Sequence, residues 1–449
     1  MKNVYFIGIG GIGMSAIARY YNHRGLHASG YDRTPSELTA QLEAEGIAVH
    51  YEDRPDLLPE DRNETLVVYT PAIPHDLGEL VKAQEKGYRV VKRSRILGEL
   101  TAGQDTLAVA GTHGKTTTST MIAHILEDSG MGCSAFLGGI SKNYGTNYLV
   151  NTNSTVVVEA DEFDRSFLQL HPQIAVITAM DADHLDIYGD LEHVWQAYRD
   201  FASQVSDFII AKLDLPLDPA AYTAKMLRYH CSDSRADFYA ANMRLEDDGH
   251  YTYDIVHPNG VIKDIREGVL GLPNVENSVA AAAVCLLHGV SEDAVRHGIS
   301  TFKGVKRRME EHLNEGGITY IDDYAHHPAE IAASLGSIKE IFAGRKVCAI
   351  FQPHLYTRTR DFAAEFAEAL SKADEVVLLD IYPAREEPIP GVESDIIYDK
   401  LTCPQKTLLR YNELIDWIKT HELDVLVTFG AGNIDRLVEH ITELLKERI

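Results

Sequence analysis

The sequence has few cysteines, and they follow no pattern. Five cysteines are scattered through 449 residues, and none forms a CxxC pair. An odd number of cysteines without a repeated spacing argues against a disulfide framework and against a zinc site, and it favours a reducing compartment. We therefore expect a cytoplasmic protein.

The sequence also lacks a long hydrophobic run and an excess of basic residues. No stretch of about eighteen apolar residues occurs, which argues against a membrane-spanning helix. The apolar N-terminus is interrupted by four glycines and is not followed by a cleavage-like site, so it does not read as a signal peptide. The formal net charge of −25 argues against nucleic-acid binding through a broad basic surface. An anionic ligand would have to be bound by local positive groups, such as helix N-termini, a few Arg or Lys side chains, or metal ions.

What is present is a repeated alternation of strand and helix patterns. Apolar residues make up 45% of the chain and charged residues 24%, as in ordinary globular proteins, and the length suits about three domains. Predicted strands include His27–Tyr31 and Thr155–Glu159, and one predicted helix covers Thr357–Leu370. The stretch from about 206 to 270 reads as a β-rich insertion.

The predicted fold class is therefore α/β with three domains. It consists of a Rossmann-like N-terminal domain, a P-loop-type central domain and a Rossmann-like C-terminal domain. The predicted boundaries are 1–103, 104–303 and 304–449.

A phosphate-binding loop is predicted within DTLAVAGTHGKTTTST, residues 105–120. An apolar strand is followed by Gly111 and Gly114, and then by Lys115, Thr116 and a helical pattern. Glycines let backbone N–H groups face phosphate oxygens, the helix N-terminus adds partial positive charge, and the Lys and Thr side chains suit outer phosphates and Mg²⁺. A tight strand-to-helix turn would explain the glycines but not the Lys-Thr pair. Val109 stands where the general pattern has glycine, which indicates a subclass of these loops.

A second glycine motif, G-x-G-x-x-G, lies at residues 8–13, and Asp32 ends the next predicted strand. Taken alone, the motif fits a dinucleotide site with an acidic residue for a ribose hydroxyl. It equally fits a diphosphate on the first helix N-terminus, or glycines needed only for close packing. These alternatives stay open at this point.

Polar runs follow other predicted strands. Residues 159–162 and 181–186 are rich in carboxylates, which suit Mg²⁺ that bridges phosphates, although single carboxylates often cap helices. Asn274 and Asn277 share one face of a predicted helix and suit either an adenine edge or capping. The runs 322–328 and 352–360 favour substrate contacts, with a transition-metal site at the adjacent histidines as the alternative.

Eight motifs carry a resemblance to a known family: GIGGIGMSA (8–16), AGTHGKTTT (110–118), EADEFDRSF (159–167), DADHLD (181–186), NVENSVAA (274–281), DDYAHHP (322–328), FQPHLYTRT (351–359) and TFGAGN (428–433). In this order and spacing they resemble the bacterial Mur ligases over the whole chain. The resemblance implies an ATP-dependent ligase that joins L-alanine to the carboxylate of UDP-N-acetylmuramate through an acyl phosphate. It implies Mg²⁺, with Mn²⁺ as a substitute, small-molecule substrates without nucleic acid or membrane partners, and a monomer or weak homodimer. The alternatives are a murein-tripeptide recycling ligase and, from another class, an NAD-dependent dehydrogenase.

The resemblance also implies roles for individual residues. The implied ATP site consists of Gly111, Thr112, His113, Gly114, Lys115, Thr116, Thr117, Asn274, Asn277, Arg308 and Asp323. The implied metal ligands are Thr116, Glu159 and His184, and the implied catalytic residues are Lys115, Glu159, His184 and Arg308. The implied UDP-sugar site consists of Gly8, Gly10, Gly11, Gly13, Met14, Ser15, Asp32, Thr70 and Arg93. The implied amino-acid site consists of His326, His354 and Arg358.

Three positions depart from the family pattern. Pro273 stands where a histidine usually precedes the first Asn of the adenine motif, and Leu355 stands where many relatives carry a basic residue. No lysine occurs from His184 to Ala211, so the carbamylated lysine that bridges two metals in several relatives is absent.

Overall fold

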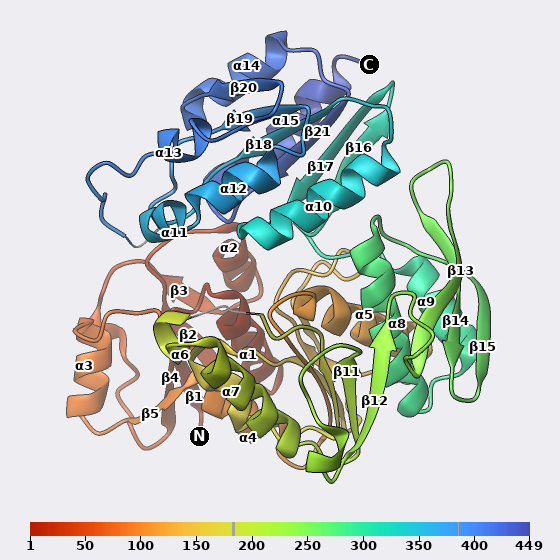
Figure 1. The fold of residues 1–449 in the computed structure, drawn as a ribbon. Coiled ribbons are helices and arrows are strands. Elements are labelled where there is room, and N and C mark those ends of the chain that lie inside the picture. The colour runs from red at the N-terminus through yellow and green to blue at the C-terminus, as the bar shows by residue number, and fades with distance from the viewer. Residues whose placement is uncertain (182–184, 385) are drawn as a thin grey trace. The chain divides into compact units, whose positions relative to one another are not determined.

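The computed structural model describes residues 1–181, 185–384 and 386–449. Within these ranges the chain contains three β-sheets, each in an α/β domain (Figure 1). The chain forms two compact units. The first consists of Met1–Asn242, Tyr253–Ile265 and Glu276–Lys303, and the second of Met243–Thr252, Arg266–Val275 and Gly304–Ile449.

The N-terminal sheet has the strand order β3-β2-β1-β4-β5, and its neighbouring strands are parallel. The strands are β1 (Asn3–Ile7), β2 (His27–Tyr31), β3 (Ala48–His50), β4 (Thr65–Tyr69) and β5 (Arg89–Lys92). The helices are α1 (Ile12–His23), α2 (Glu37–Ala44), η1 (a 3₁₀ turn, Pro55–Leu57), α3 (Gly78–Glu85) and α4 (Arg93–Thr101). The strand order reverses between β1 and β4. In doubly wound sheets, ligands bind at the carboxyl ends of the strands on either side of such a reversal.

The central sheet has ten strands in the order β15-β14-β13-β12-β11-β10-β6-β9-β7-β8. They are β6 (Asp105–Ala110), β7 (Ser134–Phe136), β8 (Tyr148–Leu149), β9 (Thr155–Glu159), β10 (Ile174–Ile177), β11 (Phe208–Lys212), β12 (Lys225–His230), β13 (Phe238–Leu245), β14 (Tyr251–His257) and β15 (Gly260–Arg266). The helices are α5 (Lys115–Asp128), η2 (Phe163–Gln169), α6 (Leu185–Tyr188), α7 (Leu191–Ser203), η3 (Pro219–Ala221), α8 (Leu272–Leu287) and α9 (Glu292–Thr301). Strand β6 lies between β9 and β10, both parallel to it, so the loop after β6 is flanked by the ends of these two strands. The β-rich insertion predicted for residues 206–270 corresponds to β11–β15.

The C-terminal sheet has the order β16-β17-β21-β18-β19-β20. Its strands are β16 (Glu310–Glu315), β17 (Ile318–Asp323), β18 (Val347–Phe351), β19 (Glu375–Leu378), β20 (Gln405–Leu408) and β21 (Val425–Phe429). The helices are α10 (Pro328–Ile341), α11 (Tyr356–Asp361), α12 (Ala363–Leu370), α13 (Asp395–Tyr398), η4 (Tyr411–Glu413), α14 (Leu414–Thr420), η5 (Asn433–Leu437) and α15 (Val438–Lys446). Strand β16 pairs antiparallel with β17, and the other strand pairs are parallel.

The single helix predicted for Thr357–Leu370 is wrong, because the structure divides it into α11 and α12. Phe362 separates the two helices with φ −118° and ψ 20°. Its ring packs against His327, with the ring centroids 5.0 Å apart, and it lies against the core of this domain. A tertiary contact has therefore overridden a continuous helical pattern.

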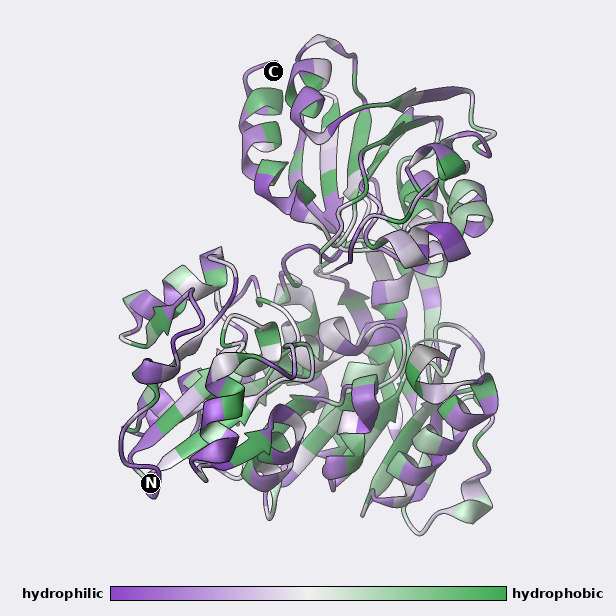
Figure 2. Ribbon diagram, turned by 90° about the vertical axis from the view of Figure 1, so that its left-hand side faces the viewer, coloured by the Kyte–Doolittle hydropathy of each residue, from purple (hydrophilic) through white to green (hydrophobic). Residues whose placement is uncertain are grey.

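Apolar residues are concentrated along the strands and on the helix faces that cover them (Figure 2). In the C-terminal domain, alternate residues of β18 belong to cores on opposite faces of the sheet, with Ala349 on one face and Ile350 on the other. In the first unit one continuous core extends from the N-terminal domain into the central domain. There Tyr20 of α1 packs against Phe136 of β7 at 5.8 Å and against Tyr148 of β8 at 6.3 Å. Within the described ranges, no helix combines the length and the apolar character that a bilayer span requires.

Candidate functional site

The loop from Gly111 to Gly114 joins β6 to α5. Both glycines have positive φ angles, 132° and 78°, which L side chains rarely adopt. A Cβ atom on Gly114 would lie 2.7 Å from Oδ1 of Asn277, and one on Gly111 would collide with Thr178, which directly follows β10. The chain can therefore turn tightly between the two strand ends and present the N-terminus of a 14-residue helix. This is the geometry of a phosphate cradle.

The ammonium group of Lys115 lies over this loop. Its Nζ donates to the carbonyl of Gly111 at 2.6 Å and to the two carboxylate oxygens of Glu162 at 2.9 and 2.8 Å. Burial acts to lower the pKa of Lys115, but the charges of Glu162, Glu159 and Asp161 outweigh it, so the pKa is raised. Lys115 therefore keeps its positive charge, and it holds this charge next to the position where phosphate oxygens would lie.

Two of the three predicted metal ligands lie within the described residues. Glu159 ends β9, its Oε2 is buried, and that oxygen has no hydrogen-bond partner among the described residues. Its carboxylate lies against Gly138, where a Cβ would collide with it. Thr116 is buried in the first turn of α5. A hydroxyl and an otherwise unsatisfied carboxylate oxygen are hard donors that fit Mg²⁺. The third predicted ligand, His184, lies outside the described residues.

Two other residues of the phosphate loop, Thr112 and His113, contact Asp181 in the segment that follows β10. Thr112 Oγ1 contacts Asp181 Oδ2 at 3.4 Å and accepts from the Asp181 N–H at 3.2 Å. The Nε2 of His113 lies 3.2 Å from the same carboxylate. The hydrogen bond from His113 lowers the pKa of Asp181. Thr117 follows in α5 and is buried. Asp181, the first residue of the predicted carboxylate run, thus adjoins the phosphate loop.

The two predicted adenine-side asparagines make different contacts. Asn277 accepts a hydrogen bond from Thr118 Oγ1 at 3.2 Å and lies against Gly114. Asn274 is buried, and its amide donates to the carbonyl of Leu270 at 2.7 Å. Asn277 therefore contacts the phosphate loop, while Asn274 supports the start of its own helix. Their predicted contacts with adenine stay predictions.

Most of the predicted UDP-sugar residues lie together at the carboxyl ends of β1 and β4. The N–H of Gly10 donates to Asp32 Oδ2 at 2.7 Å. A Cβ on Gly8 would lie 2.7 Å from Thr70 Cγ2, and one on Gly13 would lie 2.6 Å from a guanidinium nitrogen of Arg93. The structure thus places one cation beside the N-terminus of α1. Such an arrangement suits a diphosphate.

Three further residues of this set support the loop. Met14 is 1% exposed and belongs to the core, and Ser15 is fully buried. The hydroxyl of Ser15 donates to the carbonyl of Ile12 at 2.9 Å and accepts from the Asn147 amide at 2.9 Å. Gly11 is the N-cap of α1. Asn147 of the central domain therefore connects that domain to α1 by hydrogen bonds, and the sequence alone did not indicate this role.

In the C-terminal domain, Asp323 is the last residue of β17 and is 6% exposed. Its carboxylate accepts from the N–H of Ala325 at 3.1 Å and from the hydroxyl of Ser334 at 2.7 Å. Burial raises its pKa to about 6, against the opposing effects of Ser334 and the Arg308 charge. The Arg308 guanidinium lies 5.2 Å from the centre of the Tyr324 ring. The charge of Arg308 thus acts on the Asp323 carboxylate, and the predicted contacts of the two residues with phosphate and ribose stay predictions.

Of the predicted amino-acid residues, His326 and His354 lie in the loops that follow β17 and β18, and Arg358 lies in α11. The rings of His326 and His354 are 6.2 Å apart and nearly perpendicular. His354 also stacks on Tyr382 at 5.9 Å. Burial lowers the pKa of His326, and the charge of Arg358 in α11 lowers it further, against the opposing effect of Glu330. The structure therefore brings His326, His354 and Arg358 into one cluster.

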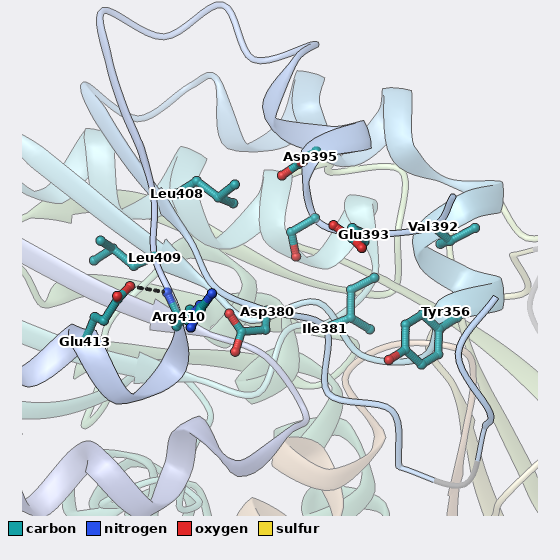
Figure 3. Close-up of a pocket in the computed structure, with 11 residues that line it drawn as sticks. Tyr356, Asp380, Ile381, Val392, Glu393, Asp395, Leu408, Leu409, Arg410 and Glu413 are labelled. Atoms are coloured by element: carbon teal, nitrogen blue, oxygen red, sulfur yellow. Dashed lines mark hydrogen bonds between the residues drawn. The ribbon is translucent and has the colours of Figure 1, made fainter. Parts of the chain in front are cut away.

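A separate cavity of about 510 Å³ lies on the C-terminal domain near the ends of β19 and β20 (Figure 3). Among the described residues, its lining includes none of the predicted site residues. Tyr356, which lines the cavity, begins the helix that carries Arg358. Its charged lining residues are Asp380, Glu393, Asp395, Arg410 and Glu413. This cavity is therefore distinct from the histidine cluster.

Sequence reasoning also missed Glu162 and Arg307. Glu162 belongs to the EADEFDRSF motif, but only its burial beside Lys115 distinguishes it from the neighbouring carboxylates. Arg307 Nε donates to Asp322 Oδ2 at 3.0 Å, and its guanidinium lies 5.2 Å from the ring of Tyr324. In the sequence, Arg307 stands in the basic cluster Lys306-Arg307-Arg308, and this cluster was the feature that could have indicated a functional role.

Comparisons with known proteins agree over the whole chain. Three family profiles match it: "Mur ligase family, catalytic domain" at residues 3–105, "Mur ligase middle domain" at 109–285, and "Mur ligase, glutamate ligase domain" at 307–432. The UDP-N-acetylmuramate–L-alanine ligase of Parabacteroides distasonis is 50% identical and covers 99% of this chain and 98% of its own length. That of Porphyromonas gingivalis strain W83 is 48% identical over 99% of both chains.

Solved structures show the same architecture. The crystal structure of UDP-N-acetylmuramate-alanine ligase from Thermotoga maritima is 27% identical, covers 100% of both chains and has a TM-score of 0.85. A murein peptide ligase from Psychrobacter arcticus is 22% identical over 99% of both chains, with a TM-score of 0.69, and supports the fold alone.

Proposed function

Since this chain belongs to the Mur ligase family, we propose that it joins L-alanine to the carboxylate of UDP-N-acetylmuramate with conversion of ATP to ADP and phosphate. The reaction would serve peptidoglycan precursor synthesis in the cytoplasm. The two relatives at 50% and 48% identity, matched along almost their full length, bear the name of this activity.

One observation carries the ATP-dependent part of the proposal. A glycine loop at the N-terminus of α5 holds Lys115 over the position for phosphates, and Glu159 ends the adjacent strand β9 with a buried oxygen that has no hydrogen-bond partner among the described residues. A dehydrogenase has no use for either group, because hydride transfer requires neither a polyphosphate lysine nor a carboxylate for a metal.

The chemistry is phosphoryl transfer followed by acyl transfer. The muramate carboxylate attacks the γ-phosphorus, the bond from that phosphorus to the bridging oxygen breaks, and ADP leaves. The amine of L-alanine then attacks the carbonyl carbon of the acyl phosphate, loses a proton and displaces phosphate. Bound Mg²⁺ would neutralise charge on the phosphates.

The residues of this chain bind, orient and neutralise. Lys115 and the N-terminus of α5 bind the outer phosphates, and Thr116 and Glu159 would hold Mg²⁺. Arg93, beside the N-terminus of α1, would bind the diphosphate of the UDP-sugar.

In the C-terminal domain, Arg358 would bind the carboxylate of L-alanine as a charge-assisted partner. His326 and His354 lie in the same cluster and would orient the substrate. His326 is largely neutral near pH 7, because its burial lowers its pKa.

The proposal is tested by measuring phosphate release from ATP and Mg²⁺ with UDP-N-acetylmuramate while only the added amine is changed. We expect turnover with L-alanine and compare it with glycine, L-serine and the murein tripeptide. Turnover with the tripeptide alone would assign the chain to the recycling ligases. Absence of ADP under every combination, together with quenching of NADH fluorescence on binding, would reject the ligase class.

A further inference from the structure

The lysine of the phosphate loop already has a complete set of acceptors. An ammonium group has three N–H donors. In Lys115 they face the carbonyl of Gly111 at 2.6 Å and the two oxygens of Glu162 at 2.9 and 2.8 Å. The side chain of Lys115 is 14% exposed and that of Glu162 only 3% exposed, so water offers few alternative partners. Lys115 can bind a phosphate oxygen only by exchanging or sharing one of these contacts.

Glu162 is held firmly at this position. Its carbonyl accepts from the hydroxyl of Tyr188 at 2.7 Å and from the N–H of Arg165 at 2.9 Å. Arg165 itself has a left-handed backbone, with φ 54°. These two hydrogen bonds fix the carbonyl of Glu162, and the enclosed side chain, 3% exposed, has little room to leave Lys115. It therefore stays near the lysine when an anion enters the loop.

The residue before Glu162 connects to the other glycine loop of the same unit. Asp161 Oδ2 accepts from Arg93 at 3.0 Å, and Arg93 lies against Gly13 at the N-terminus of α1. Two adjacent carboxylates, Asp161 and Glu162, thus pair with the two cations that lie beside the glycine loops. Asp161 is partly exposed, with 35% of its side chain accessible, whereas Glu162 is enclosed. The enclosed pair is the one that a bound nucleotide must disturb.

We propose that Glu162 is a positioning residue: it is an internal counter-ion that holds Lys115 over the phosphate loop and competes with the outer phosphates of the nucleotide for it. Two effects follow. The carboxylate weakens nucleotide binding, because a negative group remains beside the phosphates. It also speeds the reaction, because Lys115 is kept in one geometry rather than several. This inference deepens the proposed function, but it requires only that the loop binds a nucleotide.

The test is the binding of a non-hydrolysable ATP analogue, β,γ-methylene-ATP, to the full chain by calorimetry with Mg²⁺ and without UDP-sugar or amino acid. We expect Glu162→Gln to tighten this binding about tenfold, because a charged carboxylate no longer competes with the phosphates for Lys115. Binding of AMP should not change, because AMP has no outer phosphate for Lys115 to contact. In the complete reaction, kcat should fall while the KM for ATP also falls.

Two further variants keep the test decisive. Asp164→Asn makes the same carboxylate-to-amide change two residues away, at a residue that pairs with Lys92 at 2.9 Å, and should leave analogue binding unchanged. Glu162→Asp keeps the charge on a shorter side chain and should bind the analogue like the wild type while losing kcat. Unchanged or weaker analogue binding by folded Glu162→Gln would overturn the proposal. Because this assay contains no acceptor substrate, a failure to ligate L-alanine would count against the proposed function and not against Glu162.

Discussion

Replacing Asp323 by asparagine should stabilise the C-terminal domain at neutral pH. Burial raises the pKa of this carboxyl to about 6, whereas its ordinary value is 3.8. The folded state therefore keeps a proton that the unfolded state releases between about pH 4 and pH 6. Stability falls as the pH rises through this window, and above it the folded state bears the full cost of a buried charge. Asparagine can keep both hydrogen bonds, to the Ala325 N–H and to Ser334.

The size of the effect follows from the shift. A difference of about 2 pKa units, at 1.36 kcal/mol per unit, corresponds to about 3 kcal/mol. We expect Asp323→Asn to raise the free energy of unfolding by about 3 kcal/mol at pH 7.5 and by only about 1 kcal/mol at pH 4.5. The informative quantity is the difference between the stability gains at pH 7.5 and pH 4.5, because this difference is independent of any packing difference between the two side chains.

Urea unfolding measured by tryptophan fluorescence provides the assay. The chain has two tryptophans. Trp417 lies in α14 of the C-terminal domain and Trp195 in α7 of the first unit. In a Trp195→Phe background, Trp417 therefore reports on the C-terminal domain alone. Asp399→Asn, an equivalent change at an exposed aspartate, is the matched control and should show no such gain.

Two results would refute this reasoning. An equal gain at pH 4.5 and 7.5 would mean that the buried charge is not the cause. A loss of stability confined to pH 7.5 would mean that the ionised carboxylate is favoured in the folded state. If Asp323 also binds ribose, as the resemblance implies, the more stable variant should lose activity, as is common where a charge is buried for function.

Three further predictions concern the two glycine loops and the predicted metal site. Lys115→Ala should lower turnover by about 10²–10³-fold, measured by phosphate release, while calorimetry shows unchanged UDP-sugar binding; loss of both would mean that the two sites are not separate. Gly13→Ala would place a methyl group 2.6 Å from a guanidinium nitrogen of Arg93 and should weaken UDP-sugar binding about tenfold without affecting an ATP analogue. Equal loss of both ligands would point to general misfolding. Glu159→Gln should raise the Mg²⁺ concentration for half-maximal activity by about tenfold or more, and an unchanged Mg²⁺ titration would remove Glu159 from the metal site.

Local features of the sequence predicted much of the fold. The strand limits of His27–Tyr31 and Thr155–Glu159 agree with β2 and β9. Both glycine loops were predicted, because glycine at a sharp turn between an apolar run and a helical pattern is a signal within a few residues. The helix break at Phe362 was not predicted, because it depends on a ring contact with His327, which is distant in the sequence.

For the site, the sequence by itself determined which chemistry is available: two glycine loops, a lysine, and carboxylates at the ends of parallel strands. The tertiary structure alone decided which charges meet. Glu162 is 47 residues from Lys115, and Arg93 is 68 residues from Asp161, yet each pair is in direct contact. The glycine pattern is local because it reflects backbone conformation, whereas ion pairing between distant segments depends on the register of whole strands and on burial.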